Sequence, residues 1–346
     1  MGGLLFKTER KKLTDFNKYR KNIEDVMNFF QIEYEIPLYY RDKKDFGDLD
    51  IIIKNTVPIE KLLHIFSDCE CHYDKSETVV SFNYENFQID FIRVNPEDFG
   101  IAFHYFSYND LGNLIGQIAK YKHLKFGFDG LKYNHYVKGQ KLGSINISKN
   151  IDDILRFLDL DPIKFHQGFD SMKEVFDYVV KSKYFNPYAY DMEPYGYDKA
   201  GVALYRLNKI NRDRNSKRKT YQEWLEYVKR YKTGEDNYTF RDKRNIEDVY
   251  DEIDKFFPKS KFGNKLRNMQ SIEESRLMIK EKFNGNIIME LLPDLNKKSM
   301  QSFINDFKCF IEMKYDTFND YIINTKQDII NDDIIRFFDK FKKEYI

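Results

Sequence analysis

Two aspartates separated by one residue give the clearest chemical signal in the sequence. Asp48 and Asp50 stand at the start of the β-branched run 51–53. Because successive side chains of a strand point to opposite faces, both carboxylates are predicted to share one face, about 7 Å apart. A third carboxylate, Asp90, lies inside the otherwise apolar segment 87–94, where it needs a compensating charge.

If the two strands are neighbours, the three carboxylates converge on one patch. Hard divalent cations neutralise such a patch, and Mg²⁺ prefers oxygen ligands while it keeps some of its water. Two Mg²⁺ ions, or Mn²⁺ in their place, can activate a hydroxyl and hold a leaving pyrophosphate. The sequence therefore predicts a metal site at Asp48, Asp50 and Asp90. The opposing interpretation is that Asp48 and Asp50 form an ordinary solvated strand end.

Residues just upstream of these acids suit an anionic substrate. Gly47 directly precedes Asp48, and a glycine lets a phosphate approach the backbone closely. Arg41 is a candidate for binding a triphosphate, because its guanidinium matches phosphate geometry. Both residues favour a nucleotide as the substrate of the predicted metal site.

The elements that must position these residues indicate an α+β fold. Strands are predicted at 33–40 and 48–53, and a hairpin is predicted from 79–84 and 87–94. Apolar spacing predicts helices at 14–31, 58–66, 98–106, 110–122, 151–159, 170–182 and 216–231, and helix and loop beyond 245. The prediction is a small mixed sheet at the N-terminus followed by a mostly α-helical C-terminal half.

Charge and composition narrow the classes of partner. The 346 residues carry 57 Lys and Arg against 56 Asp and Glu, which excludes a strongly basic nucleic-acid coat but allows a local patch. Such a patch lies between Arg206 and Lys232. It is interpreted either as a contact surface for nucleic acid or as a solvated helical face. The residues predicted to contact nucleic acid are Arg206, Arg212, Arg214, Lys217, Arg218 and Lys219. A Tyr-rich segment, 184–198, is the predicted linker, and a second boundary is predicted near 233–240.

The remaining composition indicates a cytoplasmic protein. Three cysteines do not make a disulfide framework, and a reducing compartment fits them better. The sequence shows no signal-peptide pattern and no apolar run of the roughly 20 residues that a membrane span needs. We therefore expect no membrane partner.

Three motifs in order resemble the DNA polymerase beta superfamily, and within it the family X DNA polymerases. The stretch from Tyr39 to Ile53 resembles the palm signature, with Gly47-Asp48-Leu49-Asp50 as its core. The stretch from Gln88 to Gly100 resembles the strand of the third aspartate and the proline turn after it. Residues 101–107 resemble the aromatic motif that follows, and Asp152–Pro162 resembles the closing helix of the thumb. The resemblance covers about residues 20–162.

The resemblance implies a role for each matched residue. Asp48 and Asp50 would bind both metal ions, and Asp90 would bind the catalytic ion and help to deprotonate a 3′-hydroxyl. The implied nucleotide-binding residues are Arg41 and Gly47 for the triphosphate, Tyr105 and Phe106 for the sugar, and Asp110 and Asn113 for the base. Core packing is the open alternative for the two aromatic residues.

The sequence also departs from the family pattern. Pro37-Leu38 replaces a Gly-Ser element that binds phosphate, and Leu38 has no hydroxyl. Tyr108 stands where the family has glycine, and Gln88 stands where it has an arginine. Triphosphate binding would then depend on Lys43 and Lys44, or on lysines of the C-terminal half.

The resemblance implies a nucleotidyltransferase palm at 1–95, a thumb-like helical subdomain at 96–165, and a helical domain at 166–346 that is a candidate for nucleic-acid binding. The expected function is transfer of a nucleoside monophosphate from an NTP or dNTP to a 3′-hydroxyl of DNA or RNA, with release of pyrophosphate. Two alternatives stay open. One is a toxin- or defence-type transferase that modifies tRNA or a protein hydroxyl, and the other is a catalytically degenerate palm that acts as a nucleic-acid-binding scaffold.

Overall fold

The computed structural model describes residues 5–137, 140–197, 203–204, 207–232 and 246–346. The chain divides into two compact units, Met1–Phe262 and Gly263–Ile346. The N-terminal half is rich in strands and the C-terminal half is helical, which confirms the predicted α+β class. The expected ranges 1–95 and 96–165 both fall in the first unit, and 166–346 is divided between the two.

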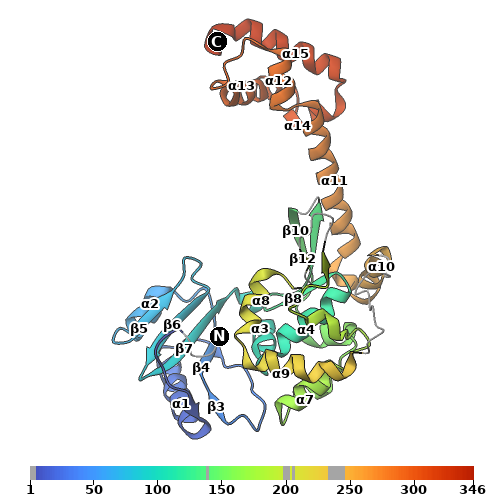
Figure 1. The fold of residues 1–346 in the computed structure, drawn as a ribbon. Coiled ribbons are helices and arrows are strands. Elements are labelled where there is room, and N and C mark those ends of the chain that lie inside the picture. The colour runs from blue at the N-terminus through green and yellow to red at the C-terminus, as the bar shows by residue number, and fades with distance from the viewer. Residues whose placement is uncertain (1–4, 138–139, 198–202, 205–206, 233–245) are drawn as a thin grey trace. The chain divides into compact units, whose positions relative to one another are not determined.

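A five-stranded sheet dominates the N-terminal part of the first unit (Figure 1). Its strands, in spatial order, are β2 (Tyr34–Glu35), β4 (Asp48–Lys54), β7 (Phe87–Val94), β6 (Val79–Tyr84) and β5 (Glu70–Tyr73). The β4–β7 pair is parallel and the other pairs are antiparallel. The predicted hairpin is confirmed as β6 and β7, and its turn residues Glu85 and Asn86 both have the positive φ that a tight hairpin turn requires. A separate two-stranded pair joins β1 (Lys11–Lys12) to β3 (Asp45–Phe46).

Helices α1 (Leu13–Phe29) and α2 (Ile59–Ile65) cover one face of the five-stranded sheet (Figure 1). The buried residues of this layer include Phe16, Ile23, Met27 and Leu62 from the helices and Leu49, Ile51, Ile53, Ile89 and Phe91 from β4 and β7. Because the strand period is two, the side chains between these positions point to the opposite face. Asp48, Asp50 and Asp90 occupy those alternate positions.

The opposite face of the sheet is apolar at one end and acidic at the other. At the apolar end, Ile52, Ile92 and Val94 pack against α3 (Phe99–Phe106) through Ala102. The acidic end is the start of β4 and the middle of β7. The same sheet face therefore carries a buried apolar layer against α3 at one end and a polar site at the other.

A three-stranded antiparallel sheet follows α4 (Leu111–Tyr121) and was absent from the sequence prediction. Its strands are β8 (Leu124–Gly127), β9 (Gly130–Val137) and β10 (Gln140–Ser148). Gly130 turns the chain between β8 and β9 with a φ of 97°, and an added Cβ there would lie 2.5 Å from the Ser148 carbonyl oxygen. This turn therefore requires glycine on both conformational and steric grounds.

The rest of the first unit is mainly helical. Its helices are α5 (Ile151–Phe157), α6 (Pro162–Gln167), α7 (Met172–Val179), α8 (Lys209–Ser216), α9 (Lys219–Val228) and α10 (Ile246–Phe256), with a short pair β11 (Gly196–Tyr197) and β12 (Ala203–Leu204). The prediction of a linker at 184–198 is wrong, because Tyr190 is fully buried and packs against the buried Trp224 with ring centroids 4.9 Å apart. The boundary predicted near 233–240 lies outside the described residues.

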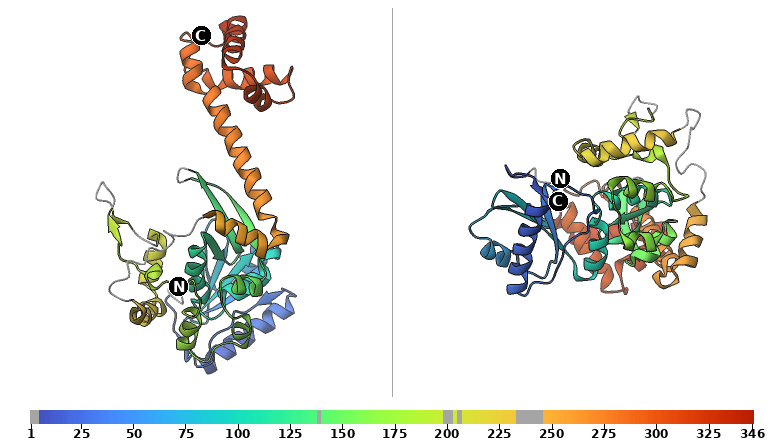
Figure 2. Two further views of the ribbon diagram at one scale, coloured as in Figure 1. Left: turned by 90° about the vertical axis from the view of Figure 1, so that its right-hand side faces the viewer. Right: turned by 90° about the horizontal axis from the view of Figure 1, so that it is seen from below.

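The second unit is a small helical bundle. Its helices are α11 (Phe262–Lys282), α12 (Gly285–Leu291), α13 (Met300–Glu312), α14 (Phe318–Asn324) and α15 (Gln327–Phe341). Figure 2 shows α12–α15, in orange to red, gathered at one end of α11. Ile330, Ile334, Phe337 and Phe338 of α15 are buried in the core of this unit. Within the described ranges, no helix has both the length and the apolar character needed to cross a bilayer.

Candidate metal centre

Three carboxylates converge at the acidic end of the sheet face. The parallel register places Asp50 opposite Asp90, and Asp48 opposite Gln88. One oxygen from each of Asp48, Asp50 and Asp90 lies within 4.8 Å of the others, and no other group of three His, Cys, Asp or Glu in the described ranges meets this condition. Asp48 and Asp50 are half-buried, Asp90 is 9% exposed, and Gly47 is buried directly before the first carboxylate. The geometry brings together the three residues that the sequence selected as metal ligands.

The charges of this cluster are poorly compensated within the protein. Burial, followed by the charges of Asp48 and Asp90, raises the pKa of Asp50 to about 8. Burial also raises the pKa of Asp90, although hydrogen bonds from Ser81 and Gln88 oppose the shift. Carboxylate oxygens that are crowded and short of positive charge are the donor set that Mg²⁺ prefers, so the residues present fit a divalent cation.

A buried amide fixes the orientation of Asp90. Gln88 is 2% exposed, and its Nε2 donates to both carboxylate oxygens of Asp90 at 2.9 Å. The backbone N–H of Leu5 donates to Gln88 Oε1 at 3.2 Å, which fixes the amide in turn. Sequence reasoning treated Gln88 only as a departure from a family pattern. Its spacing, two residues before Asp90 on one strand face, was the signal that could have shown this contact.

Lys43 lies close enough to the carboxylates for the charges of Asp48 and Asp50 to act on its ammonium. Burial lowers the pKa of Lys43, while the charges of Asp48 and Asp50 oppose the change. Its ammonium donates to Asn109 Oδ1 at 3.2 Å and lies 4.5 Å from the ring centroid of Phe46. Lys43 therefore partly neutralises the cluster and links it to the turn after α3.

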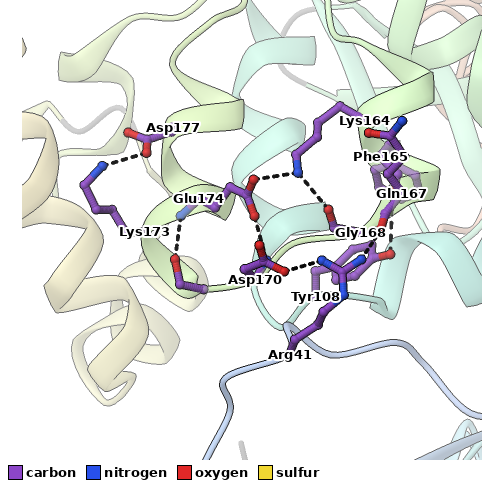
Figure 3. A network of polar contacts seen from close by, with 11 residues as sticks. Arg41, Tyr108, Lys164, Phe165, Gln167, Gly168, Asp170, Lys173, Glu174 and Asp177 are labelled. Atoms are coloured by element: carbon purple, nitrogen blue, oxygen red, sulfur yellow. Dashed lines mark hydrogen bonds and ion pairs between the residues drawn. The ribbon is translucent and has the colours of Figure 1, made fainter.

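Arg41 is directed toward the segment between α6 and α7 (Figure 3). Its guanidinium forms an ion pair with Asp170 and donates to the Gln167 carbonyl oxygen. Its backbone N–H donates to the Phe169 carbonyl oxygen at 3.0 Å. The structure therefore gives Arg41 a role in joining two parts of the first unit, and its recorded contacts do not include the three carboxylates.

The backbone of Leu38 is also engaged by the helical part. Its N–H donates to Ser107 Oγ at 3.0 Å, and its carbonyl oxygen accepts the N–H of Tyr108 at 2.6 Å. Tyr108 has a positive φ of 58°, a strained conformation for a large residue, and its buried ring packs between Phe165 and Phe169. The polar groups of position 38 therefore serve the fold and are not free to bind phosphate.

The residues predicted to contact the sugar and the base of the nucleotide lie on or next to α3 and α4. Two of them are aromatic residues that pack, and two are polar residues. Tyr105 packs against Phe106 and Phe126, and Phe106 belongs to the apolar layer beneath α3. Asp110 is 6% exposed and forms an ion pair with Arg218. Asn113 has a buried Nδ2 atom without a hydrogen-bond partner in the described structure. The aromatic pair is therefore partly a packing feature, and of the two polar residues Asp110 is paired with Arg218.

The predicted basic patch is divided by burial. Lys217 and Lys219 are exposed, and Arg214 and Arg218 are half-buried near Asp110. Arg212 donates to the Leu207 carbonyl oxygen at 2.7 Å, and Arg206 lies outside the described residues. The patch is therefore not one continuous solvated face.

No family model and no curated protein matches this sequence.

Proposed function

We propose that the protein is a metal-dependent nucleotidyltransferase. It transfers a nucleoside monophosphate from an NTP or dNTP to a 3′-hydroxyl of DNA or RNA and releases pyrophosphate. The observation that carries this proposal is the set of three carboxylate oxygens, from two adjacent parallel strands, within 4.8 Å of one another. The resemblance of residues 39–53 and 88–107 to the palm of the DNA polymerase beta superfamily supports the same activity. In this proposal residues 1–95 form the palm, and the protein acts in the cytoplasm.

Asp48, Asp50 and Asp90 would hold two Mg²⁺ ions, or Mn²⁺ in their place. When bound, the ions would supply the positive charge that neutralises the nucleotide phosphates and lowers the pKa of the attacking hydroxyl. The protein supplies carboxylates that the sheet already holds at the right separation, so little rearrangement is needed on binding.

The chain's own residues position the reactants and accept a proton. The acceptor oxygen attacks the α-phosphorus, the bond from this phosphorus to pyrophosphate breaks, and the hydroxyl proton passes to the carboxylate of Asp90. Gln88 holds the two oxygens of Asp90 in place for this proton transfer. Because phosphoryl transfer depends on alignment, the rigidity of β4 and β7 is central to the proposed activity.

The test is an assay with labelled NTPs and dNTPs, Mg²⁺ or Mn²⁺, and DNA, RNA and tRNA acceptors. We expect extension of a nucleic-acid 3′ end with release of pyrophosphate, reduced by about 10²–10³-fold or more in Asp90→Asn. Asp45→Asn is the matched control, because this exposed aspartate is close in sequence but outside the cluster. Circular dichroism shows whether each variant keeps its fold.

Three outcomes would contradict the proposal. Absence of any transfer by the wild-type protein is the first, and unchanged activity in Asp90→Asn is the second. The third is binding of nucleic acid without turnover, which would favour a scaffold. Labelling of tRNA away from its 3′ end, or of a protein hydroxyl, would keep the metal-dependent transferase but replace the acceptor.

A further inference from the structure

Two arginines lie close enough to the Asp110 carboxylate, at the start of α4, for its charge to act on them. Arg218 forms an ion pair with Asp110, and the two side chains are only 21% and 7% exposed. Asp110 precedes α4, and Arg218 lies between the end of α8 and the start of α9. The ion pair therefore joins two parts of the chain more than one hundred residues apart, and it fixes the position of the Arg218 guanidinium.

Arg214 adds a second guanidinium to this location. It is half-buried, and no described residue forms a hydrogen bond or an ion pair with its guanidinium. The groups that affect its charge are Arg218, Tyr105 and Asp110, and burial together with Arg218 lowers the pKa of Arg214. Two positive charges therefore face one negative charge in a partly desolvated place, where an unneutralised cation is unfavourable.

A chain of contacts connects these arginines to the carboxylate cluster. Lys43 is affected by the charges of Asp48 and Asp50, and it donates to Asn109 Oδ1 at 3.2 Å. Asn109 directly precedes Asp110, which pairs with Arg218. The surplus positive charge and the predicted metal ligands thus lie at the two ends of one short series of contacts.

The loop before β4 offers few free donors for an anion. The Leu38 N–H is engaged by Ser107, and the Arg41 guanidinium is engaged by Asp170 and the Gln167 carbonyl (Figure 3). A substrate with several phosphates would need positive groups elsewhere in the first unit. Among the residues that the structure describes, Arg214 offers a half-buried guanidinium for this purpose.

We propose that Arg214 and Arg218 form a phosphate-binding site that serves the transferase proposed above, with Asp110 holding Arg218 in position. The inference rests on that proposed function and names a ligand group for it. A guanidinium binds a phosphate through two parallel hydrogen bonds, and two guanidiniums side by side can share one phosphate group. The phosphate belongs either to the nucleotide or to the backbone of the nucleic-acid acceptor.

The first experiment measures binding of inorganic tripolyphosphate to the full chain by calorimetry, in EDTA so that the carboxylate cluster holds no metal. We expect Arg214→Gln to weaken binding by about tenfold or more, as loss of a charged hydrogen-bonding group predicts. Lys217→Gln is the matched control, because it removes one positive charge from an exposed position three residues away, and it should change binding less than twofold. Arg214→Lys should restore part of the affinity.

Arg218 needs a different variant, because its removal alone leaves the buried Asp110 carboxylate without this cation. The double variant Arg218→Gln/Asp110→Asn removes both charges and should also lose tripolyphosphate binding. Thermal unfolding of each variant shows whether the loss of binding accompanies a loss of structure. Equal affinity in wild type, Arg214→Gln and Lys217→Gln would overturn the inference, and so would equal losses in the last two.

Two further ligands distinguish the sources of the phosphate. Weaker binding of ATP and dATP by Arg214→Gln, with unchanged binding of an oligonucleotide that lacks terminal phosphates, assigns the site to the nucleotide. The reverse result, with a salt slope that falls by about one, assigns it to the acceptor backbone. Asp50→Asn should keep tripolyphosphate binding in EDTA and lose transfer. If the wild type binds tripolyphosphate through Arg214 but transfers nothing, the transferase proposal fails while the phosphate site remains.

Discussion

Asp50 is a destabilising residue in the metal-free protein. Its pKa rises from an ordinary value of 3.8 to about 8, chiefly through burial and the charge of Asp48. The folded state therefore binds more protons than the unfolded state between these two pH values. The stabilisation from this group is complete below about pH 4 and is lost as the pH rises toward 8.

Asp50→Asn should therefore raise the melting temperature of the protein in EDTA at pH 8. We expect a gain of a few kcal/mol in the free energy of unfolding. A shift of about four pKa units at ~1.4 kcal/mol each sets an upper bound of about 6 kcal/mol, and part of the shift is shared with neighbouring carboxylates. The gain should shrink toward pH 4. Thermal unfolding across this pH range measures it, and a variant that is less stable than wild type at pH 8 would show that Asp50 is not strained by charge.

Gln88 should control how tightly the cluster binds metal. Gln88→Ala removes both hydrogen bonds to the Asp90 carboxylate, so that this ligand becomes free to rotate. We expect Mg²⁺ affinity to fall about 10–100-fold, the usual effect of losing a group that orients a metal ligand. The measurement is the Mg²⁺ dependence of the melting temperature.

Asn83→Ala is the control for Gln88, because Asn83 pairs with Gln88 across β6 and β7 without a hydrogen bond to Asp90. Its Mg²⁺ affinity should match that of the wild type. Equal losses in the two variants would indicate a general effect on the sheet and would remove the orienting role of Gln88.

Local sequence patterns predicted the five-stranded sheet far better than the second one. The run 51–53 and the alternation in 79–84 are strong strand signals, because β-branched and apolar residues recur with period two. In β9, Leu131 and Tyr133 alternate with Lys132 and Asn134, but His135 and Tyr136 break the alternation, so the strand signal is short. The Asp129-Gly130 pair was a hairpin signal of the right type, and it lay between two short runs that each gave weak evidence for a strand.

The carboxylates of the site could be selected from sequence, whereas their surroundings could not. Asp48, Asp50 and Asp90 stand out because charged residues are rare inside apolar strands. The ion pairs of Arg41 with Asp170 and of Arg218 with Asp110 join positions more than one hundred residues apart. No local pattern in the chain encodes such partners, so the sequence did not show that each arginine is paired with a carboxylate.

Lys122 links α10 to the rest of the first unit through an ion pair. This lysine is fully buried, its ammonium forms an ion pair with Glu252 of α10, and it lies 4.3 Å and 4.1 Å from the ring centroids of Phe157 and Tyr184. Lys122→Met removes the cation beside Glu252 and should lower the free energy of unfolding by about 3–5 kcal/mol. Urea denaturation followed by circular dichroism measures the loss.

Two further variants separate this ion pair from a general effect of removing lysine. Lys125→Met changes an exposed residue of β8 and should alter stability by less than about 0.5 kcal/mol. Adding Glu252→Gln to Lys122→Met should recover part of the loss, since it removes the second charge. A Lys122→Met protein as stable as wild type would contradict the role of the pair.

At the scale of the whole molecule, the two units have separate cores, and the second unit carries no net charge. The core of the second unit is built from its own aromatic and aliphatic residues, among them Phe303, Phe307 and Phe337. Residues 263–346 contain 14 Lys and Arg against 14 Asp and Glu. A unit without net charge gives little long-range attraction for nucleic acid.

We therefore expect residues 263–346 to fold when produced alone and to bind oligonucleotides weakly. Circular dichroism should show a cooperative thermal transition, and fluorescence anisotropy should show no steep dependence of affinity on salt. Residues 1–262 should keep the salt-dependent binding of the full chain. Tight, salt-sensitive binding by the isolated second unit would instead assign the nucleic-acid contact to it.

The alternation of β4 has a consequence for any large survey of amino-acid replacements. Leu49, Ile51 and Ile53 belong to the hydrophobic layer, so replacing them with polar residues should reduce how much protein accumulates in cells. Asp48 and Asp50 alternate with these residues along the strand. Uncharged replacements of the two aspartates should leave the protein level unchanged and should be lost only in a selection for catalysis. One survey of protein level and one of activity, compared position by position along this strand, would separate the residues required for folding from those required for catalysis.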